Sequence, residues 1–111
     1  MKKIIYILTI VLIFSGCSNE HELNMDRAAI FYERGEYENA VLEYTSVINH
    51  YATDVSSLNE KTIHMLANAH HNLAVIHFKR AYETQDPVEI ASFLEKANTE
   101  AKIAYDLYPM D

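Results

Sequence analysis

Apolar residues recur at helical spacing over most of the chain. Between residues 37 and 51 they fall three and four positions apart, which is typical of a helix with one buried stripe. The members of this stripe are Tyr37, Ala40, Val41, Tyr44, Val47, Ile48 and Tyr51. Similar spacing predicts further helices at about 25–34, 58–83 and 87–107. The chain has only two glycines and two prolines, which argues against an all-β fold rich in tight turns.

Local signals predict where these helices begin and end. Gly35 stops the first helix, and Asn24 is expected to cap its start. Ser57 and Glu60 form a capping box for the third helix. Asp86, directly before a proline, caps the fourth helix. The four helices therefore form two antiparallel αα-hairpins, an all-α fold.

The long third helix carries two apolar faces, so we expect it to be packed on both sides. One face holds Leu66, Ala69, Leu73 and Ile76, and the other holds Ala74, Phe78 and Ala81.

The N-terminus shows a different pattern. Lys2 and Lys3 precede an apolar run from Ile4 to Phe14, which fits a signal peptide and is too short for a transmembrane helix. Two small residues then lead to Cys17, the only cysteine of the chain.

The segment Phe14-Ser15-Gly16-Cys17 resembles the lipobox of bacterial lipoproteins. The resemblance implies that residues 1–16 are a lipoprotein signal peptide and that acylated Cys17 enters the lipid bilayer. Two or three acyl chains are enough for a stable anchor. Residues 17–24 are then the lipidated cysteine and a polar tether, and residues 25–111 are the helical domain. The alternative is an unprocessed segment with an incidental cysteine.

Residues 28–48 resemble a tetratricopeptide (TPR) repeat. Ala28 and Ala40 occupy the small positions where two helices cross, and Gly35 occupies the turn. A second, looser copy covers 72–109, with a lengthened helix and turn relative to the family's period of about 34 residues. His77 lies there where an aromatic residue is expected. The alternative is a plain four-helix bundle in which the same residues are core.

TPR domains bind peptides or helices in a groove lined by the first helix of each hairpin. The resemblance assigns seven residues to a partner-binding groove. They are Met25, Tyr32, Asn68, His71, Val75, Phe78 and Lys79. With two repeats only, the same strip could instead be covered by the chain itself or by a second copy, because repeat proteins need about three units or caps.

Charge and composition exclude several classes of function. Once residues 1–16 are removed, seven basic residues face sixteen acidic ones, a net charge of −9, which argues against nucleic-acid binding. No two of the six histidines are three or four residues apart, so no helical metal site is expected. Catalytic and phosphate-binding motifs are absent, so we expect neither an enzyme nor a cofactor.

These observations predict a membrane-anchored, non-enzymatic adaptor that binds an envelope protein or peptide. It resembles the small TPR lipoproteins that serve outer-membrane assembly and secretion. The alternative is an exclusion or sequestering lipoprotein of a mobile element. Ser18 follows Cys17 where aspartate would favour inner-membrane retention, so we expect the outer membrane, facing the periplasm, in a Gram-negative host.

Overall fold

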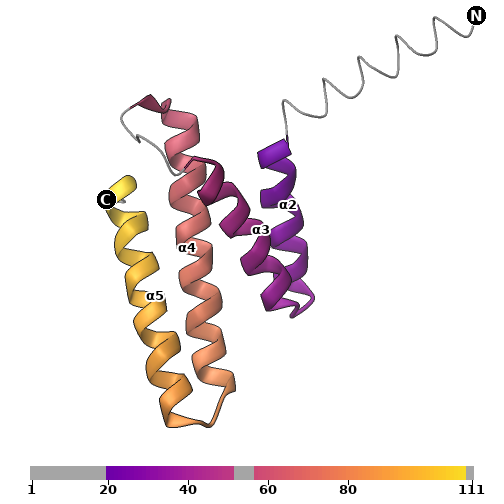
Figure 1. Ribbon diagram of the computed structural model, residues 1–111, viewed down its shortest axis with the longest axis vertical. Coiled ribbons are helices and arrows are strands. Elements are labelled where there is room, and N and C mark those ends of the chain that lie inside the picture. The colour runs from indigo at the N-terminus through magenta and orange to yellow at the C-terminus, as the bar shows by residue number, and fades with distance from the viewer. Residues whose placement is uncertain (1–19, 52–56, 110–111) are drawn as a thin grey trace, which may run out of the picture.

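The computed structural model describes residues 20–51 and 57–109, and these ranges contain four helices and no strand (Figure 1). The helices are α2 (Glu20–Glu33), α3 (Tyr37–His50), α4 (Glu60–Glu83) and α5 (Pro87–Leu107). The predicted all-α fold is confirmed. None of the four helices is both long and apolar enough to cross a membrane.

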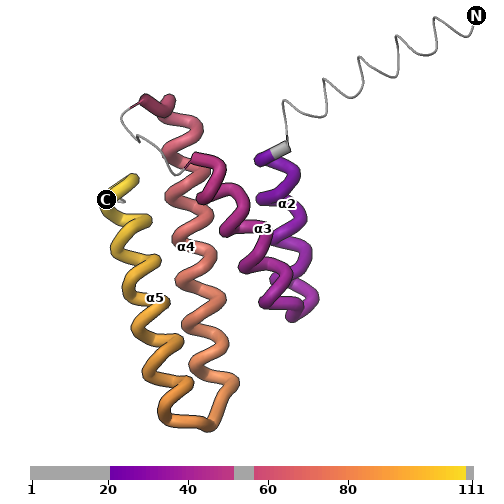
Figure 2. Tube along the Cα trace, in the orientation of Figure 1, coloured from indigo at the N-terminus to yellow at the C-terminus, as the bar shows by residue number. Residues whose placement is uncertain are grey.

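The helices form two antiparallel hairpins, as predicted. Each helix packs against the next one along the chain: α2 on α3, α3 on α4, and α4 on α5. Figure 2 shows α3 lying between α2 and α4, with α5 on the far side of α4. The second hairpin is the longer one, with helices of 24 and 21 residues against 14 and 14 in the first.

Gly35 makes the turn of the first hairpin. Its φ of +76° lies in the left-handed region, which glycine adopts without a steric penalty. The next amide, that of Glu36, donates to the Phe31 carbonyl at 2.8 Å, and the Gly35 amide donates to the Tyr32 carbonyl at 3.0 Å. These bonds satisfy carbonyl groups that the end of α2 would otherwise leave without partners.

The turn of the second hairpin is also as predicted. The Asp86 carboxylate accepts a hydrogen bond from the Val88 amide at 3.0 Å, and Pro87 occupies the first position of α5. Proline fits there because its missing N–H has no partner in the first turn of a helix.

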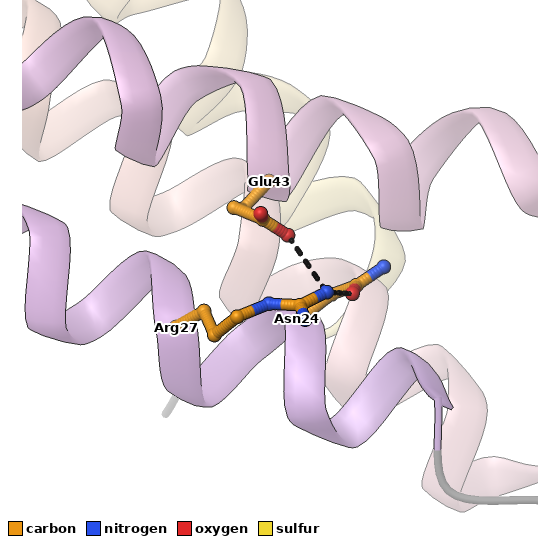
Figure 3. A network of polar contacts seen from close by, with 3 residues as sticks. All are labelled: Asn24, Arg27 and Glu43. Atoms are coloured by element: carbon orange, nitrogen blue, oxygen red, sulfur yellow. Dashed lines mark hydrogen bonds and ion pairs between the residues drawn. The ribbon is translucent and has the colours of Figure 1, made fainter. Parts of the chain in front are cut away.

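The predicted start of the first helix is wrong. The helix begins at Glu20 rather than Met25, so residues 20–24 belong to α2 and not to a tether. Asn24 is buried inside the helix, where its side-chain oxygen accepts a hydrogen bond from Arg27 one turn later. Arg27 also reaches Glu43 of α3 at 3.4 Å (Figure 3). Packing against α3 thus outweighs the capping preference of asparagine.

The predicted capping box of the third helix is wrong as well. Helix α4 begins at Glu60, and its cap is Asn59, whose side chain accepts from the Thr62 amide at 2.8 Å. The first intrahelical bond runs from the Ile63 amide to the Asn59 carbonyl. Serine and asparagine cap about equally well, so the sequence alone does not choose between Ser57 and Asn59.

The core lies where α2, α3 and one face of α4 meet. The main cluster of buried residues there is Ala28, Ala40, Tyr44, Ala69, Leu73 and Ile76. Ala28, Ala40 and Ala69 are completely buried, which lets the helix backbones approach closely. The second apolar face of α4 is only partly covered, because Ala74 and Ala81 are buried while Phe78 is 48% exposed.

Candidate functional site

Five of the seven predicted groove residues line one groove. Tyr32 contributes from α2, and His71, Val75, Phe78 and Lys79 contribute from α4. The groove has a volume of about 490 Å³. Five of the residues that the TPR resemblance assigned to the first helix of each hairpin are therefore brought together here in space.

Sequence reasoning missed the part of the groove that α5 supplies. The other lining residues are Ala74 and Tyr82 of α4, and Ala97, Asn98 and Ala101 of α5. Ala97 and Ala101 are four residues apart and share one face of α5, and their small side chains leave a hollow beside α4. That spacing is visible in the sequence, but it equally fits a buried helix contact.

Aromatic rings form the walls of the groove. Phe78 and Tyr82 lie with their ring centroids 5.4 Å apart, and Tyr82 is 78% exposed. The ammonium group of Lys79 lies 5.5 Å from the ring centroid of Tyr32, which connects α4 to α2. Aromatic rings are the residue type in this groove that is enriched at protein–protein interfaces.

The groove differs in charge from the rest of the chain. The electrostatic influence of Tyr32, followed by that of Tyr37, raises the pKa of Lys79 above the ordinary lysine value, at which the side chain is already charged at neutral pH. No aspartate or glutamate lines the groove among the described residues, although the whole chain has sixteen acidic residues. The groove is thus an apolar surface with a single positive charge.

Met25 and Asn68 do not line this groove. They line a second cavity of about 550 Å³ at the end of the bundle where α2 and α4 begin, together with His21, Tyr51 and Lys61. The predicted strip is therefore divided between two cavities, because Met25 and Asn68 lie closer to the N-terminal ends of their helices.

Two of the histidines lie between α4 and α5. The Nδ1 atom of His70 is 2.5 Å from a carboxylate oxygen of Glu100. His77 stacks beside Phe93 with a centroid distance of 6.4 Å, so it takes the place expected for an aromatic residue. Burial lowers the pKa of His77, and the charge of Lys96 lowers it further.

A metal centre finds no support in the described ranges. No three histidine, cysteine, aspartate or glutamate side chains gather there closely enough to hold an ion. Cys17, the predicted lipidation site, lies outside the described residues.

Comparison with known protein families gives a match at the N-terminus. Residues 1–18 match the prokaryotic membrane lipoprotein lipid attachment site, and Cys17 falls within the match. No curated protein and no solved structure matches the chain. The match supports a bacterial lipoprotein that is held in the cell envelope by lipid. The resemblance to TPR repeats stays a prediction.

Proposed function

We propose that this lipid-anchored protein is a non-enzymatic adaptor that binds an envelope protein through the groove between α2, α4 and α5. The observation that carries the proposal is the groove itself, which is apolar, aromatic-walled and free of carboxylates in an acidic chain. An amphipathic helix of the partner would place its apolar side chains on the alanine floor. A carboxylate of that helix would pair with Lys79.

We further propose that the two hairpins are TPR-like. Three features support this proposal: the completely buried Ala28 and Ala40, the positive φ of Gly35, and the packing of each helix on the next. In such repeats the end of the stack requires another helix or a cap. A partner helix in the groove would cover the exposed faces of α4 and α5 in that way.

The proposed location is the outer membrane, with the domain in the periplasm, if the host is Gram-negative. Ser18 after Cys17 supports this choice, because aspartate at that position favours inner-membrane retention.

Site-specific photo-crosslinking in the host tests the adaptor function. A photoreactive phenylalanine analogue replaces Phe78 in the groove, and the control replaces Leu42, an exposed apolar residue of α3 outside the groove. We expect a defined crosslinked protein from position 78 and none from position 42. The same crosslinks from both positions would contradict the proposal, and a crosslink to a second copy alone would indicate self-association instead.

A pair of double variants measures the strength of the contact. Tyr32→Ala/Phe78→Ala should weaken binding of the crosslinked partner about thirtyfold or more, since a central aromatic contributes about 2 kcal/mol or more. Leu42→Ala/Val88→Ala removes two exposed apolar side chains elsewhere and should leave binding unchanged. Circular dichroism of both variants controls for unfolding.

A further inference from the structure

Four helix ends meet at the end of the bundle that is nearest the lipid anchor. Helices α2 and α4 begin there, and α3 and α5 end there (Figure 1). The cavity of about 550 Å³ joins three of these ends, because it is lined by His21 of α2, Tyr51 after α3, and Lys61 of α4. A smaller hollow joins His64 of α4 to Tyr108 at the end of α5.

The chain between the anchor and the bundle is very short. Only Ser18 and Asn19 separate Cys17 from Glu20, the first residue of α2. Three residues span at most about 10–11 Å even when fully extended. Acyl chains on Cys17 hold that residue at the boundary between lipid headgroups and water. The start of α2 is therefore confined to within about 10 Å of the headgroups.

Ring side chains with polar atoms are concentrated at this end. His21 lies 3.8 Å from His50 and 5.1 Å from Tyr51, measured between ring centroids. His64 and Tyr108 form a similar pair at 3.8 Å. Tyrosine, which combines an apolar ring with a polar tip, is enriched at membrane interfaces, so Tyr51 and Tyr108 suit a position at the headgroups.

Acidic residues occur at both ends of the bundle. At the anchor end Glu22 lies 2.8 Å from Lys61, and Asp26 lines the same cavity. The α4–α5 turn at the opposite end carries Glu83, Asp86 and Glu89, and Arg80 lies in the last turn of α4. The short tether, and not a difference in charge, therefore determines which end faces the lipid.

We infer that the end of the bundle formed by the starts of α2 and α4 and the ends of α3 and α5 rests on the phospholipid headgroups. Helices α4 and α5 then project from the membrane, and the α4–α5 turn is the most distant part. With a rise of about 1.5 Å per residue, Phe78 lies about 25 Å further from the headgroups than Lys61. The groove is thus held at a fixed height above the bilayer. This inference depends on the lipid anchor and not on what the groove binds.

Fluorescence quenching in vesicles tests this orientation. The lipidated chain is reconstituted in phosphatidylethanolamine–phosphatidylcholine vesicles that contain a headgroup nitroxide lipid. Because Cys17 is blocked by its thioether, the variants Lys61→Cys and Gln85→Cys each provide one free thiol for an environment-sensitive dye. Both positions are exposed, so neither change should disturb the fold, and circular dichroism verifies this.

We expect several-fold stronger quenching at position 61 than at position 85. Equal quenching at the two positions, or stronger quenching at 85, would overturn the inference. A matched variant inserts ten glycine and serine residues between Asn19 and Glu20, which adds about 17 Å of root-mean-square reach. Quenching at position 61 should then fall, and an unchanged value would contradict the confinement by a short tether.

Discussion

The two hairpins share a helical architecture but bury their apolar residues to different extents. The α2–α3 hairpin is covered by α4, so Ala28, Ala40 and Val47 are completely buried. Large apolar side chains are exposed in both hairpins: Leu23, Ile30 and Leu42 in the first, and among others Val75, Phe78, Tyr82, Leu94 and Tyr105 in the second. In the second hairpin Val75, Phe78 and Tyr82 line one groove, which no further helix covers in the described ranges. An apolar stripe becomes core or exposed surface according to whether a neighbouring helix covers it.

The interiors of the two hairpins also differ in their polar groups. The core around α2 and α3 contains two polar groups with hydrogen-bond partners: the buried Asn24 side chain, which accepts from Arg27, and the Tyr44 hydroxyl, which accepts from Asn72 at 3.1 Å. The interface between α4 and α5 instead includes His77 and the pair of His70 with Glu100. Because burial lowers the pKa of His77, this side chain should make the stability of the fold depend on pH.

The largest expected difference in stability is between variants at two adjacent residues of α4. Ile76 faces the core and is 1% exposed, whereas Val75 faces the groove and is 38% exposed. We expect Ile76→Ala to lower the free energy of unfolding by about 2–5 kcal/mol through lost burial and a residual cavity. Val75→Ala should change it by about 0.5 kcal/mol or less. Urea denaturation of both variants measures the difference, and equal losses would show that the groove face is covered.

Alanines in the two hairpins should respond differently to enlargement. Ala40→Leu overpacks the completely buried contact between α2 and α3 and should cost about 1–3 kcal/mol. In a domain of this size that is a decrease of about 4–8 °C in Tm for each kcal/mol. Ala101→Leu enters the open groove and should leave Tm nearly unchanged. A similar decrease for both variants in a thermal melt would contradict the difference in packing.

Removing the hydroxyl of Tyr44 should cause a smaller loss of stability. Tyr44→Phe deletes the acceptor for Asn72 between α3 and α4, and we expect a loss of about 0.5–1.5 kcal/mol. Tyr82→Phe is the matched control, because the Tyr82 side chain is 78% exposed. Chemical denaturation should separate the two variants. If they are equally stable, the Tyr44–Asn72 bond does not stabilise the fold.

The side chain of His77 should make the stability of the fold depend on pH. Burial, and then the charge of Lys96, lowers the pKa of His77, so below the ordinary histidine value near 6.5 the unfolded chain binds more protons than the folded chain. His77 therefore destabilises the fold progressively as pH decreases below about 6.5. In melts recorded from about pH 7.5 to 5.5, His77→Phe should lose less stability than the wild type. Identical pH profiles would refute this role of His77.

Local sequence signals predicted the two hairpin turns well. The starts of α2 and α4 instead depend on packing, which local signals do not show. Gly35 acts through its own backbone conformation and Asp86 through its own carboxylate, so their roles are visible in the sequence. Asn24 is a good capping residue, yet Arg27 and the contact with α3 place it inside α2. The choice of Asn59 over Ser57 likewise depends on where the packed part of α4 starts.

The candidate groove was predictable only in part, for the same reason. Tyr32 and Phe78 follow from the periodicity of α2 and α4 together with the TPR resemblance. Ala97 and Ala101 could not be assigned, because an alanine pair looks the same in a buried crossing and in an open hollow. The direction in which α5 leaves α4 decides between the two, and that direction is a property of the whole hairpin.

The packing of each helix on its sequence neighbour has a kinetic consequence. Because α2 contacts α3, α3 contacts α4, and α4 contacts α5, most contacts join residues that are close along the chain. Helical proteins with such local topology fold in about microseconds to milliseconds, since only short loops must close. A lipid-anchored chain that folds this fast would expose its apolar stripes beside a bilayer only briefly. Local topology thereby reduces the time in which those stripes could insert into lipid or aggregate.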